Sequence, residues 1–160
     1  MPNFTSDYLA IRAMKTRLAA LFSTGSTYAT KYATYGGVDV KLRTDEDSEP
    51  ENVGKPLLLL EQSSGARGEW SSMAGEYRDV EVTLTSYVSE GSGAQQGTAN
   101  PVTSDELLAR DLVQEFETNY AAWRDLGLQG IMFDSGTLAK ADGSVTRKMA
   151  HRVAFKYSRI

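Results

Sequence analysis

The chain has 160 residues, and its 21 acidic side chains against 17 lysines and arginines give a formal net charge of -4 at pH 7. This length predicts a single domain over residues 1–160. The negative charge argues against a general DNA- or RNA-binding role, because phosphate contacts need a surplus of cationic side chains. The sequence contains no cysteine, which excludes disulfides, zinc–thiolate sites and thiol nucleophiles. We expect neither a membrane span, which needs roughly 18 consecutive apolar residues, nor a secretory signal.

The first predicted element is a helix over residues 6–22. Ser6 or Asp7 can cap its start, and Gly25 is a plausible end. One apolar face at helical spacing is made by Ile11, Met14, Leu18, Leu21 and Phe22.

Three strands are predicted next. Residues 38–43 alternate between apolar and charged side chains, which is typical of a half-buried strand. The run Leu57–Leu60 does not alternate, so we expect both of its faces to be covered in the interior of a sheet, with Pro56 at its first residue. Residues 77–88, "YRDVEVTLTSYV", form a long amphipathic strand.

The second half contains a helix and a closing hairpin. "TSDE" at 103–106 is a capping box, in which Thr103 and Glu106 bond reciprocally to the backbone. We expect the helix to run to about Trp123. Two strands follow, one in "LQGIMFDSG" and one in "KMAHRVAFKYSRI", joined by a long hairpin tip with a turn at Asp142–Gly143. The helix carries an i+4 stripe of Leu108, Leu112, Phe116 and Tyr120.

The predicted order is therefore α–β–β–β–α–β–β. It indicates an α+β domain, with a mainly antiparallel sheet of about five strands and two main helices packed on one face. The segments 44–54, 63–76, 89–102 and 136–147 are expected to be flexible or interaction loops, and 89–101 reads as a linker.

No pattern in the sequence predicts catalytic, cofactor-binding or metal-binding residues. His151 is the only histidine, and we interpret it as a core strand residue with one hydrogen bond, although a general base or a metal ligand is the functional alternative. The acidic loop at residues 44–54 lacks the central glycine and the final glutamate of a calcium-binding loop. "GSGAQQG" at 91–97 has the wrong spacing for a dinucleotide fingerprint, and the predicted helix starts several residues after it.

Charge and aromatic side chains suggest association surfaces instead. Residues 45–51 carry five acids and no base, whereas residues 140–160 are strongly basic, so the two segments could meet head to tail in neighbouring subunits. Trp70, in a Gly/Ser loop, is either an interface anchor or a lid on the core. The candidate interface residues are Asp45, Glu46, Asp47, Glu49, Glu51, Arg67, Trp70, Arg147, Lys148, Arg152 and Lys156.

This arrangement resembles the tail terminator proteins of long-tailed bacteriophages, which are also called tail-completion or minor tail proteins of the neck. The resemblance covers nearly the whole chain and lies in the order of segments rather than in a signature motif. This chain has extra residues at 23–35, 89–102 and 136–147. The segments are "IRAMKTRLAALF", "KPLLLLEQ", "YRDVEVTLTSYV", "TSDELLARDLVQEFETNYAAW" and "AHRVAFKYSRI".

The resemblance implies a virion structural protein, made in the host cytoplasm, that is not an enzyme and needs no cofactor. Family members form a homohexameric ring on the head-proximal end of the tail tube and stop its polymerisation. Their partners are themselves, the tail tube protein and a neck or head completion protein, and DNA only passes through the lumen. Two alternatives remain open: another neck adaptor or a tail tube subunit, and a small hydrolase or ligand-binding α+β domain.

Overall fold

The N-terminal helix forms where the sequence predicts it. This computed structural model describes residues 4–22, 37–43, 56–68, 76–89, 95–96, 102–136, 138–140 and 146–159. Helix α1 (Asp7–Phe22) begins after Ser6, whose Oγ accepts a hydrogen bond from the N–H of Leu9 at 3.3 Å. Ser6 is therefore the N-cap, and the Asp7 side chain is free for another role. The buried face of α1 consists of Ala10, Ile11, Met14, Leu18 and Phe22.

Most of the strands form one six-stranded sheet in the order β1-β2-β3-β8-β6, and β7 lies off this path and pairs with β8. β1 pairs with β2 in parallel, and every other neighbouring pair in this sheet is antiparallel. The longest ladder joins β3 to β8. The bounds of these strands are β1 Asp39–Leu42, β2 Leu57–Arg67, β3 Glu76–Ser89, β6 Gln129–Asp134, β7 Leu138–Lys140 and β8 Thr146–Arg159.

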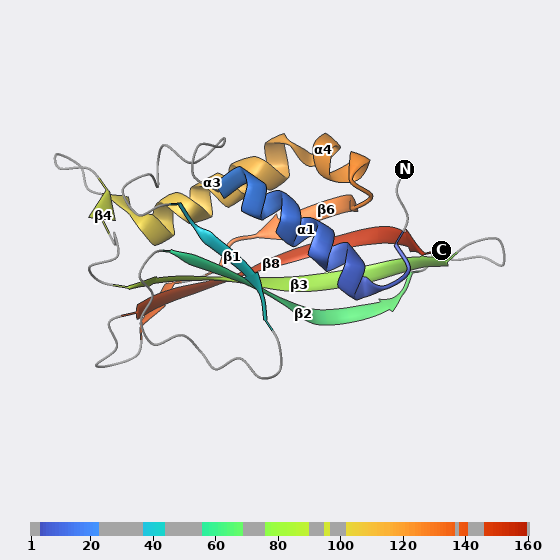
Figure 1. Cartoon of the computed structure of the whole chain (residues 1–160), viewed down its shortest axis with the longest axis horizontal. Coiled ribbons are helices and arrows are strands. Elements are labelled where there is room, and N and C mark those ends of the chain that lie inside the picture. The colour runs from blue at the N-terminus through green and yellow to red at the C-terminus, as the bar shows by residue number, and fades with distance from the viewer. Residues whose placement is uncertain are drawn as a thin grey trace.

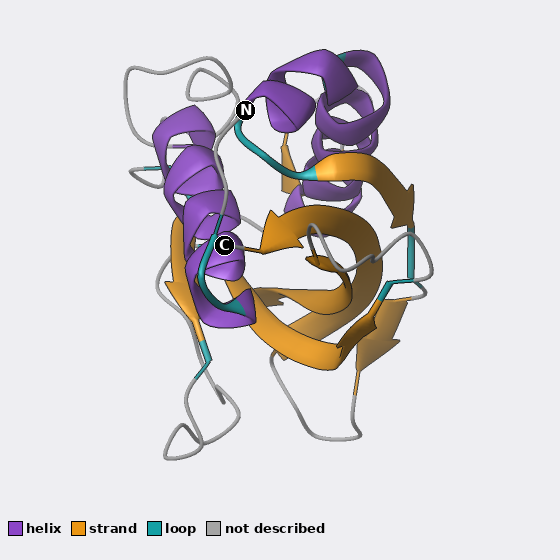
Figure 2. Cartoon of the chain, turned by 90° about the vertical axis from the view of Figure 1, so that its right-hand side faces the viewer, coloured by secondary structure: helices purple, strands orange, loops and turns teal. Residues whose placement is uncertain are grey.

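All the described helices lie on one face of this sheet. Figure 1 shows α1, α3 (Ser104–Thr118) and α4 (Tyr120–Asp125) on the same side of the strands. Helix α1 packs over β1 and β2, whereas α3 and α4 pack over β6. Figure 2 shows the sheet curving beneath the helices. The predicted α+β class, with a mainly antiparallel sheet covered on one face, is confirmed.

The four leucines occupy the interior position that their pattern predicts. Leu58 and Leu60 lie in the main core beneath the helices, where they are 0% and 1% exposed. Leu57 and Leu59 point to the other face and form a second small cluster with Tyr87. Because β1 and β3 flank this strand, its backbone is paired on both sides as well.

The predicted loop at 63–76 was wrong in its first part. β2 continues to Arg67 and stays paired with β3, with a register shift between Gln62 and Ser64. Every side chain from Glu61 to Arg67 is exposed. This half of the strand is therefore held by its backbone ladder and shows no apolar alternation in the sequence.

The single helix predicted to reach Trp123 is in fact two helices with a break at Asn119. The Nδ2 of Asn119 donates a hydrogen bond to the Oε2 of Glu115 at 2.8 Å. The break rotates the next turn, so Tyr120 is 54% exposed rather than part of the apolar stripe. Trp123 takes its place and stacks on Phe116, with ring centroids 4.8 Å apart.

Two further segments differ from the predicted loops. Gln95–Gln96 (β4) pairs with Val102–Thr103 (β5) inside the segment predicted as a linker. Leu138–Lys140 forms β7 inside the predicted hairpin tip. The proposed cap side chain of Thr103 and the turn at Asp142–Gly143 lie outside what the structure describes, as does Gly25.

Candidate functional site

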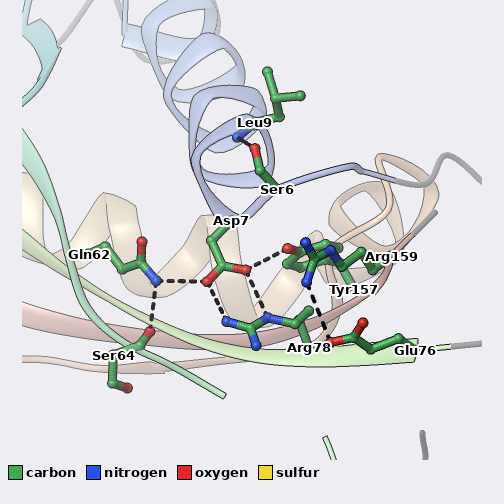
Figure 3. A network of polar contacts seen from close by, with 9 residues as sticks. All are labelled: Ser6, Asp7, Leu9, Gln62, Ser64, Glu76, Arg78, Tyr157 and Arg159. Atoms are coloured by element: carbon green, nitrogen blue, oxygen red, sulfur yellow. Dashed lines mark hydrogen bonds and ion pairs between the residues drawn. The ribbon is translucent and has the colours of Figure 1, made fainter. Parts of the chain in front are cut away.

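A carboxylate near the start of α1 ties that helix to three strands (Figure 3). Asp7 Oδ2 accepts hydrogen bonds from Arg78 Nη2 and Gln62 Nε2, both at 2.9 Å. Its Oδ1 accepts from Arg78 Nε at 3.2 Å and from the Tyr157 hydroxyl. Because β2, β3 and β8 supply these donors, we call Asp7, Gln62, Arg78 and Tyr157 the Asp7 cluster.

The protonation states in the Asp7 cluster favour a structural role. Burial alone would raise the pKa of Asp7, but the hydrogen bonds from Arg78, Tyr157 and Gln62 outweigh burial, so the pKa lies below its usual value. Burial and the hydrogen bond to Asp7 raise the pKa of Tyr157 above its usual value. Asp7 therefore stays ionised and Tyr157 stays protonated at neutral pH. With both oxygens already occupied by donors, this carboxylate is an anchor rather than a general base.

A glycine makes room for this cluster. A Cβ built on Gly65 would lie 2.6 Å from Gln62 Nε2 and 3.2 Å from Arg78 Nη2, and closer still to the Asp7 carboxylate. Such separations are well inside van der Waals contact, so a side chain here would displace the Asp7 cluster.

A second buried carboxylate joins the helices to one another. Glu115, on α3, is fully buried and pairs with Arg17 of α1 at 2.8 Å. The same Arg17 guanidinium lies over the ring of Trp123 on α4, 5.0 Å from its centroid. Burying a carboxylate is costly unless it is paired and hydrogen-bonded, so this contact fixes α1 against the α3–α4 pair.

His151 occupies a core position in β8, as the structural interpretation of the sequence predicted. Its ring is fully buried, and Nδ1 accepts a hydrogen bond from the backbone N–H of Gly136 at 3.1 Å. Burial lowers the pKa of His151 to about 4, so the ring is neutral at neutral pH.

The surroundings of His151 bear on the hydrolase alternative. The Ser135 Oγ lies 3.5 Å from Nδ1, on the wall of a hollow of about 310 Å³ that α3 also lines. A serine nucleophile needs a base that is free to accept its proton and a third group that orients the base. Here the Gly136 N–H shares Nδ1 with the serine, and within the described residues Nε2 has no hydrogen-bond partner. Among the described residues, this pair therefore has no third member of a catalytic triad.

Within the described part of the chain, no group of three or more histidine or acidic side chains is placed to hold a metal ion. None of the helices in that part is both long enough and apolar enough to cross a membrane.

The other face of the sheet carries ordered charges. We call the outward charged side chains Asp79 and Glu81 of β3 and Arg152 and Lys156 of β8 the open sheet face, since no described helix covers them. Arg152 contacts both carboxylate oxygens of Glu81, at 3.1 Å each. Lys156 pairs with Asp79 at 3.1 Å. Cations of β8 thus meet anions of β3 across the strands, which holds the charged side chains in a fixed pattern.

The predicted interface residues separate into four groups. Arg152 and Lys156 lie on the open sheet face as predicted, but each has an ion-pair partner within its own chain. Lys148 is exposed, whereas Arg147 is partly buried and alternates to the other face, so the predicted basic patch is divided. Arg67 is exposed at the end of β2, beside Arg78. The acidic residues at 45–51 and Trp70 lie outside the described residues.

An apolar groove along α1 was not predicted. It has a volume of about 680 Å³ and is lined by Leu9, Arg12, Ala13, Thr16, Arg17 and Ala20 of α1, together with Phe4 and Leu126. We call this feature the α1 groove. Its helical residues recur at three- and four-residue spacing, so they form a second stripe beside the core-facing one. This spacing is visible in the sequence, but it does not stand out because most of the apolar side chains of the stripe are small alanines.

No protein-family model matches this chain, and no curated protein matches its sequence. A function for it must therefore be inferred from the fold and from the surfaces described above.

Proposed function

We propose that this chain is a virion structural protein that forms a homohexameric ring at the head-proximal end of a phage tail tube. The ring ends tube polymerisation and joins the tail to a neck or head completion protein, while DNA passes through the lumen. On this proposal the chain is not an enzyme and needs no cofactor.

The order of elements supports this proposal. The resemblance to tail terminators rests on a helix, three strands, a helix and a closing strand pair, in that order. The structure contains this series, with β4, β5 and β7 added and the second helix broken at Asn119. A fold hosts many functions, so the function has to be inferred from the surfaces as well.

The observation that carries the proposal is a pair of unlike surfaces on the two sides of the molecule. The open sheet face is charged, with its cations and anions matched. The helix side holds the α1 groove, which is apolar and includes two arginines but no acid. A two-fold dimer needs one self-complementary surface, whereas a ring that joins two different proteins needs two unlike ones.

The same observation separates a terminator from a tail tube subunit. A tube subunit stacks on copies of itself, so its two axial surfaces have to fit each other. A charge-matched sheet offers little to a groove that is apolar and basic. The two surfaces therefore favour a subunit that has a different neighbour on each side.

Negative-stain images of the purified chain test the proposal. We expect closed rings of about six subunits that stay single as the concentration rises. Stacks of rings would favour a tube subunit, and single small particles would favour a ligand-binding domain.

A further inference from the structure

We propose that the α1 groove is the docking site for an amphipathic helix from a different protein. The apolar stripe of that helix would fill the groove, and carboxylates beside the stripe would meet Arg12 and Arg17. This inference concerns a partner and does not depend on whether the chain forms a ring.

The shape of the α1 groove suits a helix. From Leu9 to Ala20 it follows α1 for about three turns, roughly 16 Å. Its floor is made of small side chains, namely Ala13, Thr16 and Ala20. Small side chains here let a second helix approach α1 closely and insert its larger side chains between the side-chain ridges of α1. Leu9 stands beside it, 40% exposed, and supplies an apolar wall.

The charge of the α1 groove selects an acidic partner. Arg12 and Arg17 are its charged lining residues, and no carboxylate lies among them. Arg17 already pairs with Glu115 and lies over the Trp123 ring, so the charge left for a partner is mainly that of the exposed Arg12.

The same charges argue against a second copy of this chain as the occupant. A symmetric contact between two copies of α1 would bring Arg12 and Arg17 of one copy against the same arginines of the other. Like charges placed opposite each other in an interface are unfavourable. The occupant is therefore a different, acidic helix, of the helix-in-groove type.

Selection from a randomised library of helical peptides displayed on yeast tests this proposal, with the full chain as bait. We expect the enriched peptides to repeat Leu, Ile or Phe at i, i+3 or i+4 and i+7, flanked by Asp or Glu. Ala20→Leu should fill the floor of the groove and weaken the selected peptides at least about fivefold, which corresponds to about 1 kcal/mol. Arg12→Glu should have a similar effect through charge.

Two matched variants serve as controls. Lys15→Glu reverses a charge on α1 outside the groove, and Ala121→Leu adds the same side chain to an exposed position on α4. Both should leave peptide binding unchanged. The proposal is overturned if every enriched peptide still binds Ala20→Leu as tightly as the wild type. It is also overturned if the apolar residues of the enriched peptides are flanked by Lys or Arg, or if the control variants weaken binding as much as the groove variants do.

Discussion

The Tyr157 hydroxyl donates a hydrogen bond to the Asp7 carboxylate, across 150 positions of sequence. It joins the first turn of the first helix to the last strand. Near this contact Phe4 forms a parallel bridge to Arg159, so the two ends of the described chain are held together. The Asp7 cluster thus closes the fold at its termini, where the first and last residues of most domains are poorly held.

The variant Asp7→Asn tests the strength of this closure. It keeps the shape of the side chain but removes the negative charge that faces the mostly buried Arg78. We expect a loss of roughly 1.5–3 kcal/mol in the free energy of unfolding, the usual range for hydrogen bonds to charged groups. Urea denaturation at pH 7 measures it. Asp125→Asn, at an exposed ion pair, is the control and should change stability by less than about 0.5 kcal/mol.

Because the pKa of Asp7 is lowered in the folded state, the contribution of Asp7 to the free energy of unfolding depends on pH. The contribution is fully present above 3.8, the ordinary pKa of the group, and is lost as the pH falls through the lower value of the folded state. Above pH 5 the difference between the wild type and Asp7→Asn should therefore be constant. A difference that already shrinks between pH 7 and pH 5 would contradict this account.

Gly65→Ala tests the claim that glycine is needed beside the Asp7 cluster. The new methyl group would collide with the cluster, so we expect a loss of roughly 1–3 kcal/mol in the free energy of unfolding. Ser64→Ala, on the same exposed stretch of β2, is the control. In a double-mutant cycle with Asp7→Ala the two losses should be less than additive, because removal of the carboxylate relieves part of the collision. Strictly additive losses would show that Gly65 acts through something else.

His151 should make the fold less stable in mild acid. Its pKa is about 4 when folded against 6.5 for the ordinary group, so the unfolded chain binds a proton in this interval and the folded chain does not. Stability is therefore complete above 6.5 and falls as the pH drops toward 4, by roughly 3 kcal/mol from this group.

Comparison with His151→Gln isolates that effect. Glutamine can still accept the Gly136 hydrogen bond but does not titrate in this range. Unfolding measured at pH 7 and pH 4.5 should show a smaller acid loss in the variant than in the wild type. Equal losses in the two proteins would mean that His151 is protonated in the folded state.

Sequence periodicity predicted the elements whose side chains meet the core. Leu57–Leu60 and the alternation in β3 and β8 required buried faces, and these faces are buried. Periodicity could not find the second half of β2, because its exposed residues are polar and show no apolar alternation. It also placed Tyr120 in the core, because the i+4 spacing assumes one continuous helix, whereas the helix breaks at Asn119.

The surfaces were harder to predict than the fold. Arg152 and Lys156 were assigned to the correct polar face, since strand alternation determines it. Their partners Glu81 and Asp79 depend on which strands are neighbours, and sequence patterns do not specify this. Asp7 was considered only as a helix cap, because its donors Gln62, Arg78 and Tyr157 come from three distant strands.

Charge reversal on the open sheet face tests its use in assembly. Arg152→Glu with Lys156→Glu should block assembly without unfolding the subunit, because exposed ion pairs contribute only up to about 1 kcal/mol each. The control adds Glu81→Arg and Asp79→Lys, which restores both pairs within the subunit with reversed polarity. Assembly should stay blocked in the control, as judged by light scattering, while circular dichroism shows folded protein in both. If the control regains assembly, only the pairs within the subunit matter.

The mass of the purified protein as a function of concentration tests the central claim most directly. Light scattering on chromatographic fractions, over about a hundredfold range of concentration, gives this mass without a label. A closed hexameric ring predicts a plateau near six times the 17.5 kDa subunit. A mass that keeps rising with concentration, or one that stays at a single subunit throughout, would contradict the ring.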